Sequence, residues 1–573
     1  MASPTRDTST HRAAISRPSS TYTRKRGIKA CQVCRARRTK CDQKRPSCSF
    51  CVKAGVECVF EPDANATFDQ ASLAIIDRLD RLERKIDAQS ANRKGQDGSP
   101  STDNLSLCTS PSAPIPSREG LFPVNLDGVL NWPVFQGLTS PTATASSPYS
   151  SRSYAQPHSQ QSAWLGHELD PATCDRWLDN FFAHVHVKNP ILDEAGTRRL
   201  VRRLCVQGAE WNISSGLALL VCANGALARP LHESLPLSDP DMQTAVALFD
   251  TAQRRLGTGL VSQGLVQAQC AFLSGVLLMS LLRPIEAWTT FVHGLAICQT
   301  LPSIRQRQPE MDQRTSAQFV AEQSVYWSCW KSEQELRFEL GMSRTIGPAD
   351  DPPQLFPDPP EGCQGHIERA WYFYLSEISL WRLEVDARRS IGQVEHNYRE
   401  SLSQTLSELG HSTLGQLDAW RDSLPPLVDI GNASAGMFNE DDVVRFVLRG
   451  RVTFVHELIS WPFLFAAIND APTHVDGETW VANALAFHHN RLLVNTPGFY
   501  HRHHGTWLML RSSARSACIL LGFAYLYPGS TMMPVAWKDS VSNTAKMLEH
   551  WSTEVQEMRP VLETMKRLLG IFE

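Results

Sequence analysis

Residues 31–58 read Cys31-Gln-Val-Cys34-Arg-Ala-Arg-Arg-Thr-Lys-Cys41-Asp-Gln-Lys-Arg-Pro-Ser-Cys48-Ser-Phe-Cys51-Val-Lys-Ala-Gly-Val-Glu-Cys58. The spacing C-x2-C-x6-C occurs twice, with six residues between the two units. This repeat predicts a site with approximate twofold symmetry. The segment has too few large apolar residues to bury six free cysteines in a core of its own.

Cysteine thiolates in this pattern predict a zinc site. Structural zinc takes four ligands in tetrahedral geometry, so six thiolates satisfy two zinc ions only if one cysteine from each half bridges them. We therefore predict two zinc ions, whose binding supplies most of the folding free energy of the segment. A redox dithiol is disfavoured because no βαβ pattern surrounds the cysteines. The predicted ligands are Cys31, Cys34, Cys41, Cys48, Cys51 and Cys58.

The charge of the chain is unevenly distributed. Residues 20–60 hold eleven Lys or Arg against two acids, which is +9, so the remainder carries −12 of the formal net charge of −3. A local cationic segment on an acidic body is typical of a module that binds a polyanion. The polar N-terminus has no apolar core of a signal peptide and no apolar run approaches a membrane span, so we expect an intracellular protein.

A basic turn between the second and third cysteines predicts DNA binding. Both of its ends are held by zinc ligands, so little ordering entropy is lost when it enters the major groove. Arginine pairs bidentately with guanine, and we expect Arg37 and Arg38 to read bases while other cations contact phosphate. The predicted DNA-binding residues are Arg24, Lys25, Arg26, Lys29, Arg35, Arg37, Arg38 and Lys40.

The flanking segments predict a modular organisation. Residues 1–23 resemble a disordered tail, 24–60 form the cluster module, 61–72 a connector and 73–88 a short helix. In that helix the apolar spacing of 4, 3 and 4 predicts a coiled-coil dimer, although a lone helix docking on the body would give the same pattern. The predicted dimerisation residues are Ile75, Leu79, Leu82 and Ile86.

Residues 89–160 have the Ser- and Pro-rich composition of a linker, interrupted by an apolar island at 121–135 that could dock on the body or on a partner. Residues 161–573 show apolar residues at helical spacing and no alternating strand pattern, which predicts a large all-helical domain. Examples are 177–186, 265–279, 443–458 and 507–526. The fold class is therefore mainly α, with loops near 232–242, 300–315, 345–366 and 470–478.

The cluster segment resembles the DNA-binding domain of fungal binuclear zinc cluster transcription factors. The resemblance implies that Cys31 and Cys48 bridge, that Cys34 and Cys41 complete one zinc site, and that Cys51 and Cys58 complete the other. It also implies that Pro46 lies in the loop joining the halves, and that CGG-type triplets are the half-sites. The family usually has lysine where this chain has Arg38, which changes the number of donors offered to the triplet.

The body resembles the helical regulatory region of the same family. Similar stretches are 177–193, 267–288, 327–336 and 457–464, and in the last Trp461 stands where arginine is common. The island around 132–135 also resembles a stretch found in some members of the family. The resemblance implies that this region modulates activity, sometimes in response to a metabolite, and that the short coiled coil dimerises.

We therefore predict a nuclear, DNA-binding regulator of RNA polymerase II genes, acting as a homodimer with co-regulators and a possible small-molecule effector. A pathway-specific activator, for example of a secondary-metabolite gene cluster, is favoured over a repressor. The rival class is an enzyme with a DNA-binding appendage, which a pocket with convergent ionisable groups would indicate. The sequence displays no such pocket and no Ser/His/Asp or Cys/His signature. We expect His488, His489, His501, His503 and His504 to lie at the surface, Trp327 and Trp330 in the core, and 439–442 to start a helix.

Overall fold

The computed structural model describes residues 31–58, 124–137 and 169–572, with gaps at 32, 35–36, 38, 43, 232, 237–238, 258–263, 306–316, 343–352, 354, 358, 360–362, 398–401, 432–441 and 470–476. The chain divides into two compact units, residues 1–113 and 114–573. The predicted coiled coil at 73–88 and the tail at 1–23 lie outside the described residues. No strand occurs in the part of the chain that is described.

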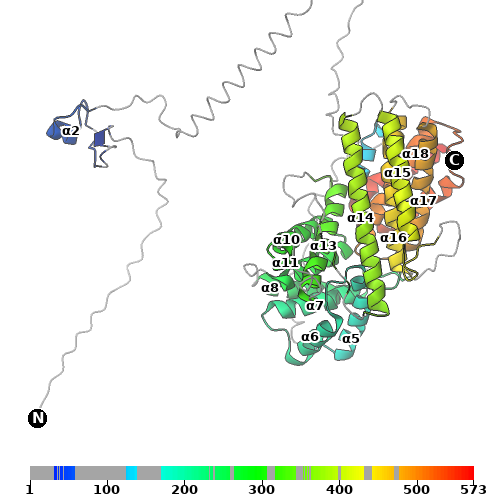
Figure 1. The fold of residues 1–573 in the computed structure, drawn as a ribbon, viewed down its shortest axis with the longest axis horizontal. Helices are drawn as coiled ribbons and strands as arrows, with labels where there is room; N and C mark the ends of the chain where they lie inside the picture. The colour runs from blue at the N-terminus through cyan, green and yellow to red at the C-terminus, as the bar shows by residue number, and fades with distance from the viewer. Residues whose placement is uncertain are drawn as a thin grey trace, which may run out of the picture. The chain divides into compact units, whose positions relative to one another are not determined.

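The first group of helices in the body spans residues 171–339 (Figure 1). It packs mainly through α7 against α5, α8 and α9, and through α10 against α9 and α13. Its members are α5 (Pro171–Asn180), the π-helical turn η3 (Phe181–Val185), η4 (His186–Lys188), α6 (Glu194–Gln207), α7 (Ile213–Leu227), α8 (Pro240–Leu256), α9 (Leu265–Ser280), α10 (Pro284–Cys298), α11 (Pro302–Arg305) and α13 (Ala317–Glu339).

The second group spans residues 366–572, and Figure 1 shows its longest helix, α14, beside α15 and α16. Helix α17 packs between α16 and α18, and α19 and α20 follow on the C-terminal side. Its members are α14 (His366–Asn397), α15 (Leu402–Asp422), α16 (Val443–Ile468), α17 (Gly477–Asn495), η7 (Thr496–Gly498), α18 (Thr506–Leu526), α19 (Trp537–Trp551), η8 (Gln556–Met558) and α20 (Arg559–Phe572).

Local sequence signals explain where several helices begin. Asp170, Asp193 and Asn212 each accept a hydrogen bond from a backbone N–H in the first turn of α5, α6 and α7. Asp442 does the same for α16, as expected for the end of the acidic run at 439–442. These side chains satisfy N–H groups that have no partner inside the helix, so they fix the helix starts.

Two helices of the body are buried on nearly every side. Almost every residue of α7 and α9 is buried, and both read as continuous apolar segments. At Gly225 in α7, an added Cβ would lie 2.1 Å from the backbone oxygen of Trp177, so only glycine permits this close approach to α5. Trp327 and Trp330 are fully buried, as predicted.

By length and composition alone, helix α16 is long and apolar enough to span a membrane. This differs from the expectation that no apolar run approaches the length of a membrane span. However, 61% of its most apolar window is buried inside the body, where α14, α15 and α17 pack against it. Its apolar character is thus accounted for by its central position in the helical core.

The expectation that the histidines at 488–504 lie at the surface is wrong for two of them. His488 is 0% exposed and His501 is 4% exposed. His488 lies between α17 and α18, where its Nδ1 is 3.0 Å from the hydroxyl of Ser516. His503 and His504 are partly buried and line a cavity.

The apolar island docks on the helical body. It forms α4 (Leu126–Leu130) and η1 (Pro133–Phe135), and we call residues 124–137 the docked segment. Leu126, Val129 and Phe135 are almost completely buried, against α18 among other elements. The Arg511 guanidinium of α18 donates a hydrogen bond of 2.7 Å to Asp127. The question that the sequence left open is therefore decided in favour of the body.

Candidate metal centre and nucleic-acid interface

The six clustered cysteines come together around two short helical turns. In the first turn the Arg37 N–H donates to the Val33 carbonyl and the Thr39 N–H donates to the Cys34 carbonyl, both at 3.0 Å. Helix α2 (Ser49–Ala54) forms the second and ends at Gly55 in the left-handed conformation. Each turn follows the first cysteine of a C-x2-C pair, so the sequence repeat appears as a structural repeat. The cis peptide before Pro46 lies in the loop between them.

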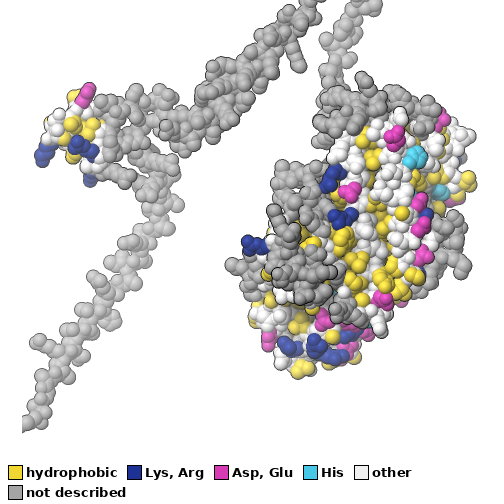
Figure 2. All heavy atoms as spheres, in the orientation of Figure 1, with side chains coloured by type: hydrophobic (Ala, Val, Ile, Leu, Met, Phe, Trp, Pro, Cys, Tyr) yellow, Lys and Arg dark blue, Asp and Glu magenta, His cyan; other side chains and the backbone are white. Residues whose placement is uncertain are grey.

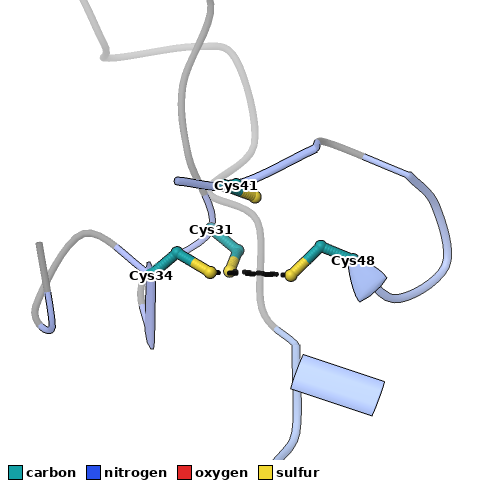
Figure 3. Close-up of side chains that lie close together, drawn as sticks. All are labelled: Cys31, Cys34, Cys41 and Cys48. Atoms are coloured by element: carbon teal, nitrogen blue, oxygen red, sulfur yellow. Dashed lines mark hydrogen bonds between the residues drawn. The ribbon is translucent and has the colours of Figure 1, made fainter. Parts of the chain in front are cut away.

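The sulfur atoms form two overlapping groups of four. One contains Cys31, Cys34, Cys41 and Cys48, and the other contains Cys31, Cys48, Cys51 and Cys58. Within each group the Sγ atoms all lie within 4.8 Å of one another. Cys31 and Cys48 are the two members that the groups share. Figure 3 shows the thiols of the first group converging from both halves of the motif.

The distances between sulfur atoms fit a zinc cluster. Four thiolates around a tetrahedral zinc at a Zn–S distance of about 2.3 Å lie about 3.8 Å apart. The Sγ atom of Cys48 is 3.7 Å from that of Cys31 and 3.6 Å from that of Cys34, and Cys31 is 3.5 Å from Cys51. A disulfide would require about 2.05 Å. The donor set therefore suits metal ions and contains no disulfide among these cysteines.

Backbone groups favour the thiolate form of the two shared cysteines. The N–H of Cys51 donates to the Cys48 sulfur at 3.4 Å, and this hydrogen bond lowers the pKa of Cys48. The corresponding hydrogen bond from Cys34 lowers the pKa of Cys31. By contrast, burial and neighbouring thiols raise the pKa of Cys34 to about 12. Metal binding must displace that proton, so zinc affinity depends on pH.

One structural residue of the centre was missed by sequence reasoning. The Asp42 carboxylate accepts hydrogen bonds from the Ser49 backbone N–H at 3.0 Å and from the Ser49 hydroxyl at 2.5 Å. These hydrogen bonds lower the pKa of Asp42. They link the segment that follows Cys41 to the first residue of α2. An acid next to a cysteine of the repeat and a serine at a helix start were the available signals.

The predicted DNA-binding residues are only partly covered by the structure. Arg37 and Lys40 are described and exposed, and Figure 2 shows basic side chains on the surface of this unit. Arg37 lies in the first helical turn, between Cys34 and Cys41. The remaining predicted contacts, Arg24, Lys25, Arg26, Lys29, Arg35 and Arg38, lie outside the described residues.

Comparison with known proteins identifies the same kind of DNA-binding zinc module that the cysteine spacing predicts. Residues 29–66 match the family described as Fungal Zn(2)-Cys(6) binuclear cluster domain. The putative transcription factor ecdB of Aspergillus rugulosus is 24% identical over 481 residues, 78% of this chain and 80% of that protein. This match is long enough to include most of the helical body. No solved structure matches the chain.

Two further relatives match over short stretches. The transcription factor FBD3 of Gibberella moniliformis is 50% identical over 38 residues, 7% of this chain and 5% of that protein. The transcription regulator galc of Aspergillus niger is 32% identical over 111 residues, 17% and 13% of the two chains. The chain thus covers only a small part of these two relatives.

Three observations define a zinc-dependent, DNA-binding regulator: the two overlapping thiol groups, the exposed Arg37 and Lys40 between Cys34 and Cys41, and relatives named as transcription factors. Residues 29–66 are thus a binuclear zinc cluster domain of the fungal Zn(2)-Cys(6) type, the chain is a DNA-binding transcription factor, and its cofactor is a pair of zinc ions. When bound, these ions cross-link the two halves of a module that has little apolar core.

Proposed function

We propose that the six cysteines are the zinc ligands, with Cys31 and Cys48 bridging the two ions. Cys34 and Cys41 complete one site, and Cys51 and Cys58 complete the other. The observation that supports this arrangement is that Cys31 and Cys48 belong to both groups of sulfur atoms. Bridging is required because eight zinc–sulfur bonds must come from six thiolates.

The module reads CGG-type half-sites in double-stranded DNA. Arg37 and Arg38 contact guanine, Arg35 and Lys40 lie beside them, and Arg24, Lys25, Arg26 and Lys29 contact phosphate. The exposure of Arg37 and Lys40 on a turn flanked by Cys34 and Cys41 is what supports this reading. The Arg37 side chain can enter the major groove of DNA because no described residue of the module covers this side chain.

The regulator acts in the nucleus as a homodimer that recruits co-regulators, and it activates the genes of one pathway, such as a secondary-metabolite cluster. Dimerisation rests on the apolar spacing of Ile75, Leu79, Leu82 and Ile86. A small-molecule effector acts on the helical body. A repressor with the same DNA reader is the alternative, which a reporter fusion to an unrelated DNA-binding domain distinguishes by the direction of the change in transcription.

The decisive experiment is selection of genomic fragments by the purified full-length protein, with zinc and then with a chelator. Paired CGG triplets should be enriched with zinc and lost without it. Arg37→Ala should weaken binding to the selected site by about 1–3 kcal/mol and relax base preference, because a bidentate guanine contact is lost. Lys53→Ala, an exposed cation in α2, is the matched control. Selection that survives chelation or shows no sequence preference would exclude the cluster as the DNA reader.

A further inference from the structure

A cavity lies among the central helices of the body. Its volume is about 200 Å³, and its walls come from α9, α10, α13, α14, α16, α17 and α18 as well as from the docked segment. An apolar cavity of about 150 Å³ is known to hold benzene. The space is therefore large enough for a single six-membered ring with one small substituent.

The polar atoms left without partners in this cavity are mostly hydrogen-bond donors. Among the described residues that line it, four buried nitrogen atoms and one buried oxygen atom have no hydrogen-bond partner. The nitrogens are Trp381 Nε1, Arg491 Nη2, His503 Nε2 and Arg515 Nε, and the oxygen is Asn189 Oδ1. Because buried donors without acceptors are costly, this surplus indicates a ligand that supplies acceptor oxygens.

His503 is a donor to the cavity for a structural reason. The Gly505 backbone N–H donates to His503 Nδ1 at 3.0 Å. Burial and the nearby His501 lower the pKa of His503, so its ring is neutral near pH 7. A neutral ring that accepts at Nδ1 carries its proton at Nε2, which is the unpartnered atom.

Two buried arginines supply guanidinium donors to one side of the cavity. Arg491 and Arg515 are 5% and 2% exposed, and both pair with the fully buried Glu457, at 2.7 and 2.6 Å. Burial would raise the pKa of Glu457, but the two guanidiniums lower it to about 2, so the carboxylate is ionised. Glu457 thus lies between two cations, and Arg515 also lies 3.7 Å from the Glu339 carboxylate.

The other acids of the cavity have their own cationic partners. Glu335 pairs with Arg451 at 3.0 Å, and Glu384 pairs with Arg388 at 2.9 Å. Glu377 pairs with Lys331, and Glu339 pairs with Arg511. These pairs offset the acidic charge that would otherwise repel an anion. The remaining walls include Phe272, Phe291, Phe338, Phe446 and Phe454, which suit an apolar ring.

We propose that this cavity is the binding site for a small aromatic carboxylate, with its ring among the phenylalanines and its carboxylate facing Trp381, Arg491, His503 and Arg515. Only the regulatory consequence of binding rests on the proposed function, in which a small-molecule effector acts on the helical body. Binding itself does not depend on DNA recognition. Charge-assisted hydrogen bonds to arginine are the strong kind that would fix such a ligand.

The site reaches the docked segment directly. Val124 lines the cavity, and its backbone carbonyl accepts a hydrogen bond of 3.1 Å from Arg515 Nη1. A ligand that fixes the Arg515 side chain therefore also stabilises one of the contacts that hold the segment. Ligand binding and docking of residues 124–137 should consequently favour each other.

The test is calorimetric titration of the zinc-loaded full-length protein with benzoate, without DNA. General ligand efficiencies place the dissociation constant of so small a ligand at about 10 mM or below. Benzylamine, which has the same ring but a positive charge, should not bind. Absence of benzoate binding in this range, or equal binding of benzylamine, would overturn the site, whereas neither result bears on DNA recognition.

Two variant pairs locate the binding. Gly450 lines the cavity, and a Cβ there would lie 3.6 Å from Arg491 Nη1, so Gly450→Leu fills the space without a steric clash at the Cβ. It should weaken benzoate binding at least tenfold. Gly392→Leu is the control, because Gly392 also lies in a helix and has nothing within 4 Å of its Cβ position.

Trp381→Phe removes one donor and keeps an aromatic ring, so it should weaken benzoate binding about threefold. Trp330→Phe removes another buried N–H without a partner, but Trp330 does not line the cavity, and affinity should be unchanged. Wild-type affinity in Gly450→Leu, or equal losses in both tryptophan variants, would contradict the assignment.

Discussion

Cys48 lies in both groups of cluster sulfur atoms, and this double membership has a stoichiometric consequence. Cys48→Ala should remove a bridging ligand and reduce bound zinc from two ions per chain to none, because each site is left with three thiolates. Cys41→Ala removes a ligand from one group only and should leave about one ion. Zinc content per chain, measured by atomic emission, distinguishes the Cys48→Ala variant from the Cys41→Ala variant.

The control for zinc content is Cys518→Ala, a buried cysteine of α18 that should leave two ions in place. About two zinc ions in Cys48→Ala would refute its bridging role.

His488 illustrates how burial makes stability depend on pH. Burial lowers its pKa to about 4, whereas an exposed histidine has a pKa of about 6.5. Between pH ~6.5 and pH ~4 the His488 side chain is protonated in the unfolded chain but stays neutral in the folded chain. The free energy of unfolding therefore decreases as pH falls from ~6.5 to ~4. The shift corresponds to about 3 kcal/mol.

His488→Gln should therefore flatten the decline in unfolding free energy between these pH values, measured by denaturant titration of the body. His293→Gln changes an exposed histidine and should leave the decline as in the wild type. Identical pH profiles for all three proteins would contradict this role of His488.

At the scale of elements, the docked segment depends on a glycine of α18. A Cβ at Gly522 would lie 3.1 Å from Phe135 Cζ and 3.3 Å from Val134 Cγ1. Gly522→Val should therefore displace the segment and raise chymotrypsin cleavage after Phe135 about tenfold, since displacement exposes a buried aromatic side chain. Gly570→Val is the control, because nothing lies within 4 Å of that Cβ position. Unchanged cleavage would show that the segment tolerates the added side chain.

The predicted dimerisation helix at 73–88 is tested at the same scale. Leu79→Pro should break the helix, because proline removes a backbone hydrogen bond and clashes with the preceding turn. Binding to paired half-sites should fall far more than binding to one half-site, measured by fluorescence anisotropy. Leu79→Ala, which keeps a helix-forming residue, should have a smaller effect. Equal losses on both DNA probes would count against the coiled coil.

For the whole molecule, the division into two compact units predicts that zinc removal acts on one of them. A chelator should unfold the cluster module and abolish DNA binding, because the metal supplies its folding free energy. The main thermal transition of the helical body should stay within about 2 °C, since its core contains none of the six cluster cysteines. Calorimetry with and without chelator measures both effects, and loss of the body transition would contradict independent folding.

The sequence by itself determined the features that depend on local spacing. The cysteine repeat predicted the clustering of six thiols because ligand spacing is short-range chemistry. Apolar periodicity predicted the helices at 265–279 and 507–526 almost to the residue, while that at 443–458 extends ten residues further, to Ile468. Acidic and amide residues marked helix starts, because capping involves neighbours only a few residues apart.

Only the tertiary structure decided the features that join distant parts of the chain. The docked segment meets α18 through residues almost 400 positions away, such as Asp127 and Arg511, and no local pattern encodes that contact. The histidines looked like a surface run because polarity predicts exposure, yet His488 is buried where α17 packs against α18. The donor-lined cavity likewise exists only because seven helices bring its side chains together.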